Sequence, residues 1–258
     1  MVTGNKEINF RKRDFHDKFL PYYKNQFSDC RVAGSGPGLL VADVSASRRK
    51  DCSGLWHRLV RAVRSTFNID FPGLKVAQSW IWEPKADRVT YEGKDKAGNP
   101  VKITYVRSQL SNQPDNVKNE IDPSFNNNQY WLFLPFHACW DAGAKVEDSG
   151  MHKLPMGGGS ARRVVMTYPP EGGGYTPGDT WEMYIGSNNL IQQLLWRRGP
   201  GKSIIVNIVD AKWLDYKKIG PLLLSLDHRG TGDGKPLRIF FTDVAVKLAG
   251  SDTWVNAQ

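Results

Sequence analysis

Cysteine is scarce in this sequence, and long hydrophobic runs are absent from it. The 258 residues include three cysteines, Cys30, Cys52 and Cys139, which are too few and too scattered for a disulfide framework or a zinc site built from cysteines. No apolar run approaches the ~20 residues that a membrane-spanning helix requires. The G-x-S-x-G, P-loop, H-x-H and H-E-x-x-H motifs are absent as well. The sequence therefore points away from these catalytic and metal-binding classes, and we expect no cofactor.

Positive charge is concentrated at the start of the chain. The sequence has 35 Lys and Arg against 26 Asp and Glu, and residues 1–67 carry 13 of the basic residues but only 6 of the acidic ones. The remaining residues are nearly neutral, whereas a domain that grips a phosphate backbone carries its own basic stripe. We therefore expect no nucleic acid partner. Binding of an anionic surface or a nucleic acid through residues 1–67 remains an alternative.

The first part of the chain is expected to lie outside the main domain. The glycine-rich cluster Gly34–Gly38 interrupts any regular element and is the best candidate for a linker. Residues 1–51 are interpreted as a basic, irregular N-terminal extension, and residues 52–258 as a single β domain. The start of the sequence does not show the basic, apolar and small-residue sections of a signal peptide, which by itself indicates a cytoplasmic protein.

A helix is predicted from Ser53 to about Phe67. Ser53 is a favourable N-cap residue, and apolar side chains recur after it at the spacing of an amphipathic helix. We expect the apolar face to pack on a sheet and the opposite, basic face to meet solvent. The apolar positions are Trp56, Leu59, Val60, Val63 and Phe67, and the basic positions are Arg58, Arg61 and Arg64.

From Leu74 onward, nearly all of the sequence predicts β-strands. The segments are rich in β-branched and aromatic residues and are bounded by turn residues. One polar connection, Ser108–Ser124, is longer than usual, and the sequence does not fix its role. About ten strands and one early helix predict a mainly β (α+β) fold, in which a large curved antiparallel sheet is wrapped around one or two helices. The predicted strands are Val76–Glu83, Asp87–Tyr91, Val101–Arg107, Tyr130–Phe136, Arg162–Tyr168, Asp179–Ile185, Leu190–Arg198, Ser203–Val209, Leu222–His228 and Leu237–Leu248.

Bulky aromatic and apolar residues recur on single faces of these predicted strands. Two interpretations remain open: the side chains form a dense core under the helix, or they line a groove for a hydrophobic ligand because one helix cannot cover them all. The second is our working hypothesis, with a lipid or another hydrophobic small molecule as the partner and no covalent chemistry. The candidate ligand-binding residues are Trp80, Trp82, Tyr105, Trp131, Phe133, Phe136, Trp140, Trp181, Met183 and Trp196.

Two groups of residues are the candidates for catalysis. His137, Cys139 and Asp141 are close together in the sequence, and Asp227 and His228 are adjacent. A hydrolase needs a nucleophile, a base and an orienting group that converge in space, which sequence adjacency does not supply. A hydrolase-type enzyme that uses either group is therefore kept as the alternative to a binding protein. Its test is whether these side chains meet at a pocket.

Several short segments rich in aromatic and turn residues carry a family resemblance. They are Trp80–Trp82, Phe125–Phe136, Trp140–Asp141, Tyr175–Asp179, Trp196–Gly199 and Leu226–Arg229. Through them, the block from about Gly54 to Leu248 resembles a group of uncharacterised, exported bacterial proteins related to periplasmic lipoprotein-carrier and lipid-binding half-barrels. These segments are typical of a scaffold rather than of a reaction.

The resemblance implies a half-barrel sheet around a helix, with an apolar groove between them. Proteins of this kind hold an acyl chain or another hydrophobic group without a cofactor, and transient contact with a membrane is expected of them. The implied location is the periplasm or another exported compartment, whereas the start of the sequence indicates the cytoplasm.

Overall fold

The computed structural model describes residues 56, 58–94, 98–141, 143–171, 176–199 and 208–258, so the predicted extension 1–51 and its linker lie outside the described residues. Strands make up most of the described chain. They are β1 (Val60–Phe71), β2 (Leu74–Glu83), β3 (Arg88–Lys94), β4 (Pro100–Val106), β5 (Lys145–Lys153), β6 (Ser160–Thr167), β7 (Thr180–Ile185), β8 (Ile191–Arg197), β9 (Ile208–Ile219), β10 (Leu222–Gly232), β11 (Lys235–Leu248) and β12 (Trp254–Asn256). The helical segments are η1 (Pro84–Ala86), η2 (Arg107–Asn112), η3 (Val117–Ile121) and α3 (Asp122–Trp140).

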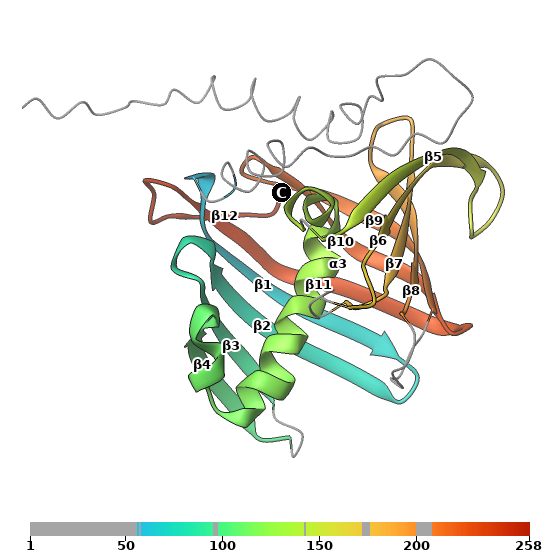
Figure 1. Cartoon of the computed structure of the whole chain (residues 1–258). Coiled ribbons are helices and arrows are strands. Elements are labelled where there is room, and N and C mark those ends of the chain that lie inside the picture. Colours follow the sequence, from blue (N-terminus) through green and yellow to red (C-terminus); the bar gives the residue numbers. More distant parts are fainter. Residues whose placement is uncertain (1–55, 57, 95–97, 142, 172–175, 200–207) are drawn as a thin grey trace, which may run out of the picture.

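The described strands form one antiparallel sheet. Its order is β4-β3-β2-β1-β11-β10-β9-β8-β7-β6-β5, and β12 pairs with β11 outside this path. Neighbours in the sheet are neighbours in the chain except at one place, where β1 pairs with β11 and Val63 lies opposite Val246. The two ends of the order, β4 and β5, do not pair with each other, and the sheet curves around α3 (Figure 1). The prediction of a large curved antiparallel sheet wrapped around a helix is confirmed.

Helix α3 occupies a part of the chain for which the sequence analysis predicted a strand and a polar connection. The predicted strand Tyr130–Phe136 is wrong because it lies within α3, and the connection Ser108–Ser124 contains η2, η3 and the first turn of α3. Pro123, in the first turn of α3, suits a helix start. A continuous apolar run such as residues 130–136 does not distinguish a buried helix from a buried strand, and residues 130–135 of α3 are all buried.

Strand β1 replaces most of the predicted helix Ser53–Phe67, which is therefore wrong. Of the described residues in this range, Trp56, Arg58 and Leu59 are helical, and β1 begins at Val60. The register of β1 against β11 shifts between Val60 and Ala62, where β1 carries one extra residue. A β-bulge of this kind moves later side chains to the other face. Residues 60, 63 and 67 therefore share the buried face of a strand while showing the spacing of a helix.

The other predicted strands agree with the structure where it describes them. β2, β3, β4, β6, β7, β8, β10 and β11 each overlap a predicted strand, although their ends differ by a few residues. Of the predicted strand Ser203–Val209, only residues 208 and 209 are described, and they begin β9. The sequence analysis did not predict β5, which lies at the edge of the sheet and has mostly polar residues.

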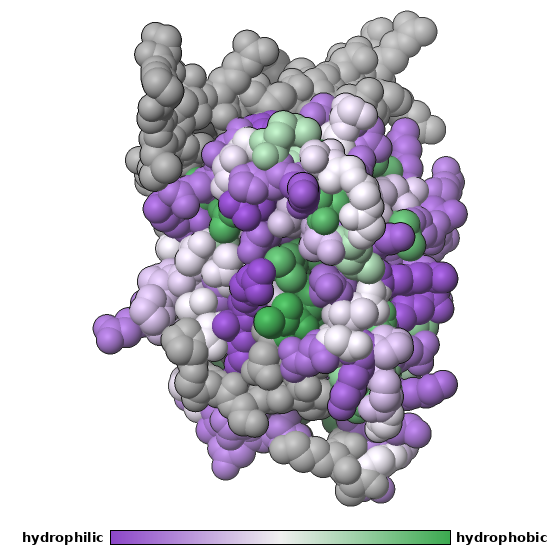
Figure 2. Space-filling model, turned by 90° about the vertical axis from the view of Figure 1, so that its right-hand side faces the viewer, coloured by the Kyte–Doolittle hydropathy of each residue, from purple (hydrophilic) through white to green (hydrophobic). Residues whose placement is uncertain are grey.

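The core lies between α3 and the concave face of the sheet. A large cluster joins the second half of α3 to β1 and to β6–β11, and a smaller cluster joins the first half of α3 to β2, β3 and β4. Among the described residues, no helix is long and apolar enough to cross a membrane. Figure 2 shows one face of the molecule, on which hydrophobic residues reach the surface in a small central patch between polar residues.

Candidate functional site

The ten candidate ligand-binding residues are divided between buried and half-buried positions. Six of them are at most 4% exposed, and the other four are half-buried and pack against the core. The buried residues are Trp80, Tyr105, Trp131, Phe133, Trp181 and Met183, and the half-buried residues are Trp82, Phe136, Trp140 and Trp196.

Helix α3 fills the concave face beneath several of these rings. The ring of Phe125 lies 5.5 Å from that of Trp80, and the ring of Trp131 lies 5.4 Å from that of Trp181. Trp181 in turn lies 5.9 Å from Trp196. These centroid distances are typical of aromatic pairs in a packed core. The ten candidate residues therefore do not share one open surface.

Five aromatic residues gather where the second half of α3 meets the start of β1 and the end of β2. We call Trp56, Trp82, Phe133, Phe136 and Trp140 the aromatic cluster. Trp56 lies at its centre, with ring centroids 4.9 Å from Trp140, 5.2 Å from Phe133, 5.4 Å from Phe136 and 6.0 Å from Trp82. Trp56 and Phe133 are buried, but the other three are half-buried, so the cluster reaches the surface of the protein. The sequence analysis missed Trp56 because it placed this residue on a long helix.

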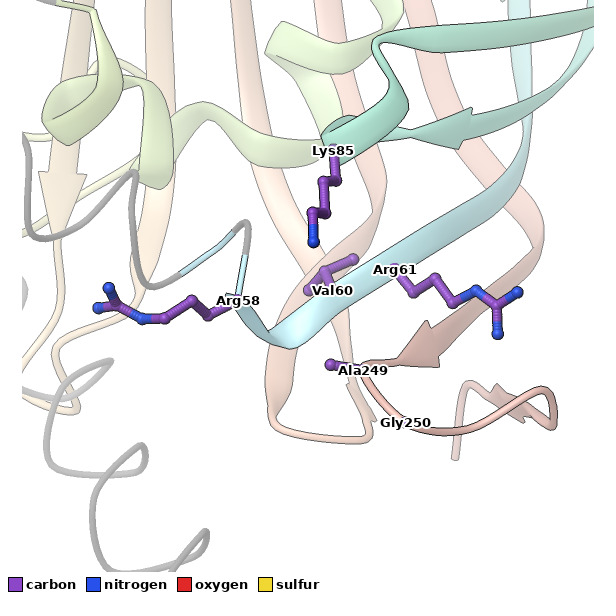
Figure 3. Close-up of a pocket in the computed structure, with 6 residues that line it drawn as sticks. All are labelled: Arg58, Val60, Arg61, Lys85, Ala249 and Gly250. Carbon is purple, nitrogen blue, oxygen red and sulfur yellow. The ribbon is translucent and has the colours of Figure 1, made fainter. Parts of the chain in front are cut away.

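A pocket of about 520 Å³ is lined by Arg58 and Lys85, which follow Trp56 and Trp82 of the aromatic cluster by two and three residues in the chain. Its floor is apolar, because Val60 is 1% exposed and belongs to the same core cluster as Trp56. A hydrogen bond of 2.9 Å from the amide of Ala249 to the carbonyl of Leu59 joins two of the lining segments. Figure 3 shows Lys85 pointing toward Val60. The lining residues are Arg58, Val60, Arg61, Lys85, Ala249 and Gly250.

Two ion pairs lie at the borders of this pocket. Arg61 contacts Asp252 at 2.6 Å, and both side chains are exposed, so this pair contributes little to stability. Glu83 accepts two hydrogen bonds from the guanidinium of Arg88, at 2.5 and 2.7 Å. These hydrogen bonds and the positive charge of Arg88 lower the pKa of Glu83, although partial burial opposes them. Asp252 and Glu83 are therefore already paired with Arg61 and Arg88.

A second polar group forms at the C-terminal end of α3. The carboxylate of Asp141 accepts hydrogen bonds from the hydroxyls of Tyr130, at 2.7 Å, and Tyr168, at 2.5 Å, and lies 3.1 Å from Nδ1 of His137. Burial raises the pKa of Asp141, but the interactions with His137 and the two tyrosines outweigh burial and lower it. Burial and the negative charge of Asp141 raise the pKa values of Tyr130 and Tyr168. Tyr168 lies 27 positions from Asp141, and no pattern in the sequence links them.

The candidate pair His137 and Asp141 is therefore brought together, but its imidazole does not face an open site. The ring of His137 stacks on Tyr130 with a centroid distance of 3.9 Å. Its Nε2 atom is buried and has no hydrogen-bond partner among the described residues. A general base needs that nitrogen within reach of a substrate. The side chain of Cys139 lies outside the described residues.

The other candidate pair, Asp227 and His228, is not brought together. These residues are neighbours on β10, so their side chains point to opposite faces of the sheet. Asp227 pairs with Arg229 at 2.6 Å and with Arg238 at 2.8 Å. His228 is 1% exposed and stacks on Trp213 with a centroid distance of 4.3 Å. Burial lowers the pKa of His228 to about 3.

A metal centre has no support in the described part of the chain. No group of three or more His, Cys, Asp and Glu side chains gathers there in a way that could hold an ion.

No protein-family model matches the chain, and no curated protein matches it. The solved structures that match include a DUF1329 family protein from Desulfovibrio piger, with 11% identity and a TM-score of 0.39 over 80% of this chain and 95% of that one. They also include the lipoprotein LppX from Mycobacterium tuberculosis, with 8% identity and a TM-score of 0.27 over 76% of this chain and 92% of LppX. A third match is to the MucA/MucB complex of Pseudomonas aeruginosa, with 13% identity and a TM-score of 0.25 over 78% of this chain and 59% of the matched one. The identities do not exceed 13% and the TM-scores are below 0.5, so these matches carry no argument about family or function.

Proposed function

We propose that this protein is a non-enzymatic binding module that holds the apolar part of a hydrophobic ligand against the aromatic cluster. The observation that carries this proposal is the aromatic cluster itself, in which the rings of Trp82, Phe136 and Trp140 are half-buried and reach the surface. A pocket of about 520 Å³ is lined by Arg58 and Lys85, which follow Trp56 and Trp82 closely in the chain. A concave apolar site with few polar groups is typical of small-molecule binding sites. The ligand is a lipid or another hydrophobic small molecule, and its binding requires no cofactor.

Burial of apolar surface supplies the affinity in this proposal. A ligand that removes about 200 Å² of apolar area from water gains about 5 kcal/mol at ~25 cal/mol per Å². Aromatic rings suit this role because they present a large apolar area at a small cost in conformational entropy. The other candidate residues support the site from beneath and do not contact the ligand directly. They are Trp80, Tyr105, Trp131, Trp181, Met183 and Trp196.

The second half of α3 is the part of the site that can adjust to a ligand. Phe133 has non-helical backbone angles, φ −118° and ψ 19°, and Pro135 lies inside the helix two residues later. A proline there removes one helix hydrogen bond and kinks the helix. The segment beyond the kink carries Phe136 and Trp140. We propose that this segment shifts to lengthen the site when an acyl chain binds.

The domain limits and location that we propose follow the expectations from the sequence. Residues 52–258 act as a single half-barrel domain, residues 1–51 as a basic extension, and the protein works in the periplasm or another exported compartment. Transient contact with a membrane would then let the domain exchange a lipid. The family resemblance supports this location, and fractionation of cells that express the full-length native gene tests it.

Extraction of the purified protein tests whether it carries a ligand. Protein isolated without detergent is extracted into organic solvent, and the extract is analysed by mass spectrometry. We expect a lipid in a stoichiometric amount. Reloading of delipidated protein with a fluorescent fatty acid then gives an affinity.

Variants of the aromatic cluster test where the ligand binds. Phe136→Ala and Trp140→Ala should each weaken binding of the fluorescent fatty acid about tenfold, because a buried aromatic contact of this size contributes about 1.5–3 kcal/mol. Phe240→Ala is the matched control, since Phe240 is a half-buried phenylalanine that contacts Arg238 on β11. Recovery of no lipid, together with no binding of the fatty acid by the native protein, would reject the proposal.

A further inference from the structure

The pocket lined by Arg58 and Lys85 carries more positive charge than its neighbours neutralise. Arg61 pairs with Asp252, but Arg58 and Lys85 have no ion-pair partner among the residues that the structure describes. Both are exposed, and in Figure 3 Lys85 reaches over the pocket toward Val60 while Arg58 extends to one side. Two free cationic groups at the mouth of one apolar-floored pocket are an arrangement that attracts an anion.

The acidic groups that could satisfy these cations are occupied elsewhere. Glu83, two residues before Lys85, accepts both of its hydrogen bonds from Arg88. Bidentate pairing of a carboxylate with an arginine is strong and geometrically specific. It therefore holds the carboxylate of Glu83 on Arg88 and keeps it from forming an ion pair with Lys85. Within the described residues, the pocket therefore keeps a positive potential.

The charged pocket and the aromatic cluster are continuous along the chain. Arg58 follows Trp56 by two residues, and Lys85 follows Trp82 by three. Three residues of extended chain span at most about 11 Å. Val60 lines the pocket and belongs to the same hydrophobic core cluster as Trp56. One molecule with an apolar tail and a charged end can therefore contact both.

We propose that this pocket binds an oxyanion, a carboxylate or a phosphate, at the end of the hydrophobic ligand, with Lys85 and Arg58 as the residues that hold it. This inference rests on the proposed function, which it extends by giving the ligand class as anionic amphiphiles. Lysine and arginine both donate charge-assisted hydrogen bonds to such groups.

Binding of two ligands that share a tail and differ in the head group tests this inference. Dodecanoate and dodecan-1-ol are titrated into delipidated protein by calorimetry, and inorganic phosphate is titrated alone. The variant is Arg58→Gln/Lys85→Gln, and the control is Lys75→Gln/Lys94→Gln, which removes the same charge from exposed lysines, one on the far end of β2 and one on β3. Exposed substitutions of this kind leave the fold intact.

The native protein and the control should bind dodecanoate about tenfold more tightly than dodecan-1-ol, because only the carboxylate makes charge-assisted hydrogen bonds. The Arg58→Gln/Lys85→Gln variant should bind both equally. Equal binding of both ligands by the native protein overturns the oxyanion site and leaves the proposed function standing. Binding of phosphate that depends on Arg58 and Lys85, without binding of either dodecyl compound, supports the oxyanion site and rejects the proposed function. No binding of any of the three overturns both.

Discussion

Replacement of His228 by phenylalanine should remove a loss of stability that the native protein suffers in mild acid. His228 is 1% exposed, and neither of its ring nitrogens has a hydrogen-bond partner among the described residues. Trp213 stacks on the imidazole and Phe241 lies at its edge, and this burial outweighs the charge of Asp227 and the backbone of Ser225, which favour the protonated ring. Burial therefore lowers the pKa of His228 from its ordinary 6.5 to about 3.

The sign and size of the effect follow from this shift. Between pH 6.5 and about 3, the unfolded chain binds a proton at His228 that the folded chain does not. The free energy of unfolding therefore falls as the pH falls through this window, by about 1.4 kcal/mol for each pH unit. From pH 8.0 to pH 4.5, the native protein should lose about 2.7 kcal/mol through this residue. Above about pH 8 the residue adds almost no pH dependence.

Urea denaturation of the native protein and of His228→Phe at pH 8.0, 6.5, 5.5 and 4.5 measures this difference. Acidic groups such as Asp141 and Asp227 titrate in both proteins, so their contribution cancels when the free energies are subtracted. A larger ring can also strain the core, which changes the difference by the same amount at every pH. His228→Leu is a second variant without a titratable group and should show the same pH profile. Parallel profiles for all three proteins would refute the reasoning.

Two further predictions concern groups with well-defined contacts. Asp141→Asn should lower the free energy of unfolding by about 2–3 kcal/mol at pH 7, because Tyr130 and Tyr168 lose a charged acceptor. The pKa of Asp141 is lowered in the folded protein, so the carboxylate stabilises the fold fully at pH values above its ordinary pKa of 3.8. This stabilisation is lost as the pH falls below 3.8. In acid denaturation, the difference in the free energy of unfolding between the native protein and Asp141→Asn should therefore shrink below that pH. Gly230→Ala should cost about 3 kcal/mol or more, since the new methyl group would lie 1.8 Å from a backbone oxygen of β9, whereas Gly143→Ala, with no atom within 4 Å, should be nearly neutral in thermal denaturation. Equal stabilities for the two alanine variants would contradict the β9–β10 geometry.

The sequence was sufficient to predict the sheet because its strands depend on local patterns. The segment Val101–Tyr105 alternates apolar with polar residues, and β4 lies there with one face toward the core. The two errors have physical causes. The run of residues 130–136 is apolar on every side, which removes the periodicity that identifies a helix, and a bulge in β1 gives a strand the spacing of a helix.

The candidate site could be predicted only in part, because its residues meet through tertiary contacts. Trp82, Phe136 and Trp140 were identified because bulky aromatic residues can be recognised from the sequence without knowledge of tertiary contacts. The charged pocket was not, since Arg58, Lys85 and Gly250 come from three distant segments that only the folded sheet places together. Nothing in the local sequence around Lys85 distinguishes it from other surface lysines.

The pairing of β1 with β11 has a consequence for how the chain reaches its native state. One part of the sheet consists of β1–β4 and the other of β5–β10, and β11 lies between them. The two parts therefore share no strand pairing until β11 has been synthesised. Residues 72–234 must be made before that seam can form, and closing so long a loop is slow. A nascent chain that ends before Lys235 would expose the unpaired rims of β1 and β10, which invite association with other chains. The strand order therefore predicts that truncation before β11 yields aggregates rather than a smaller soluble domain.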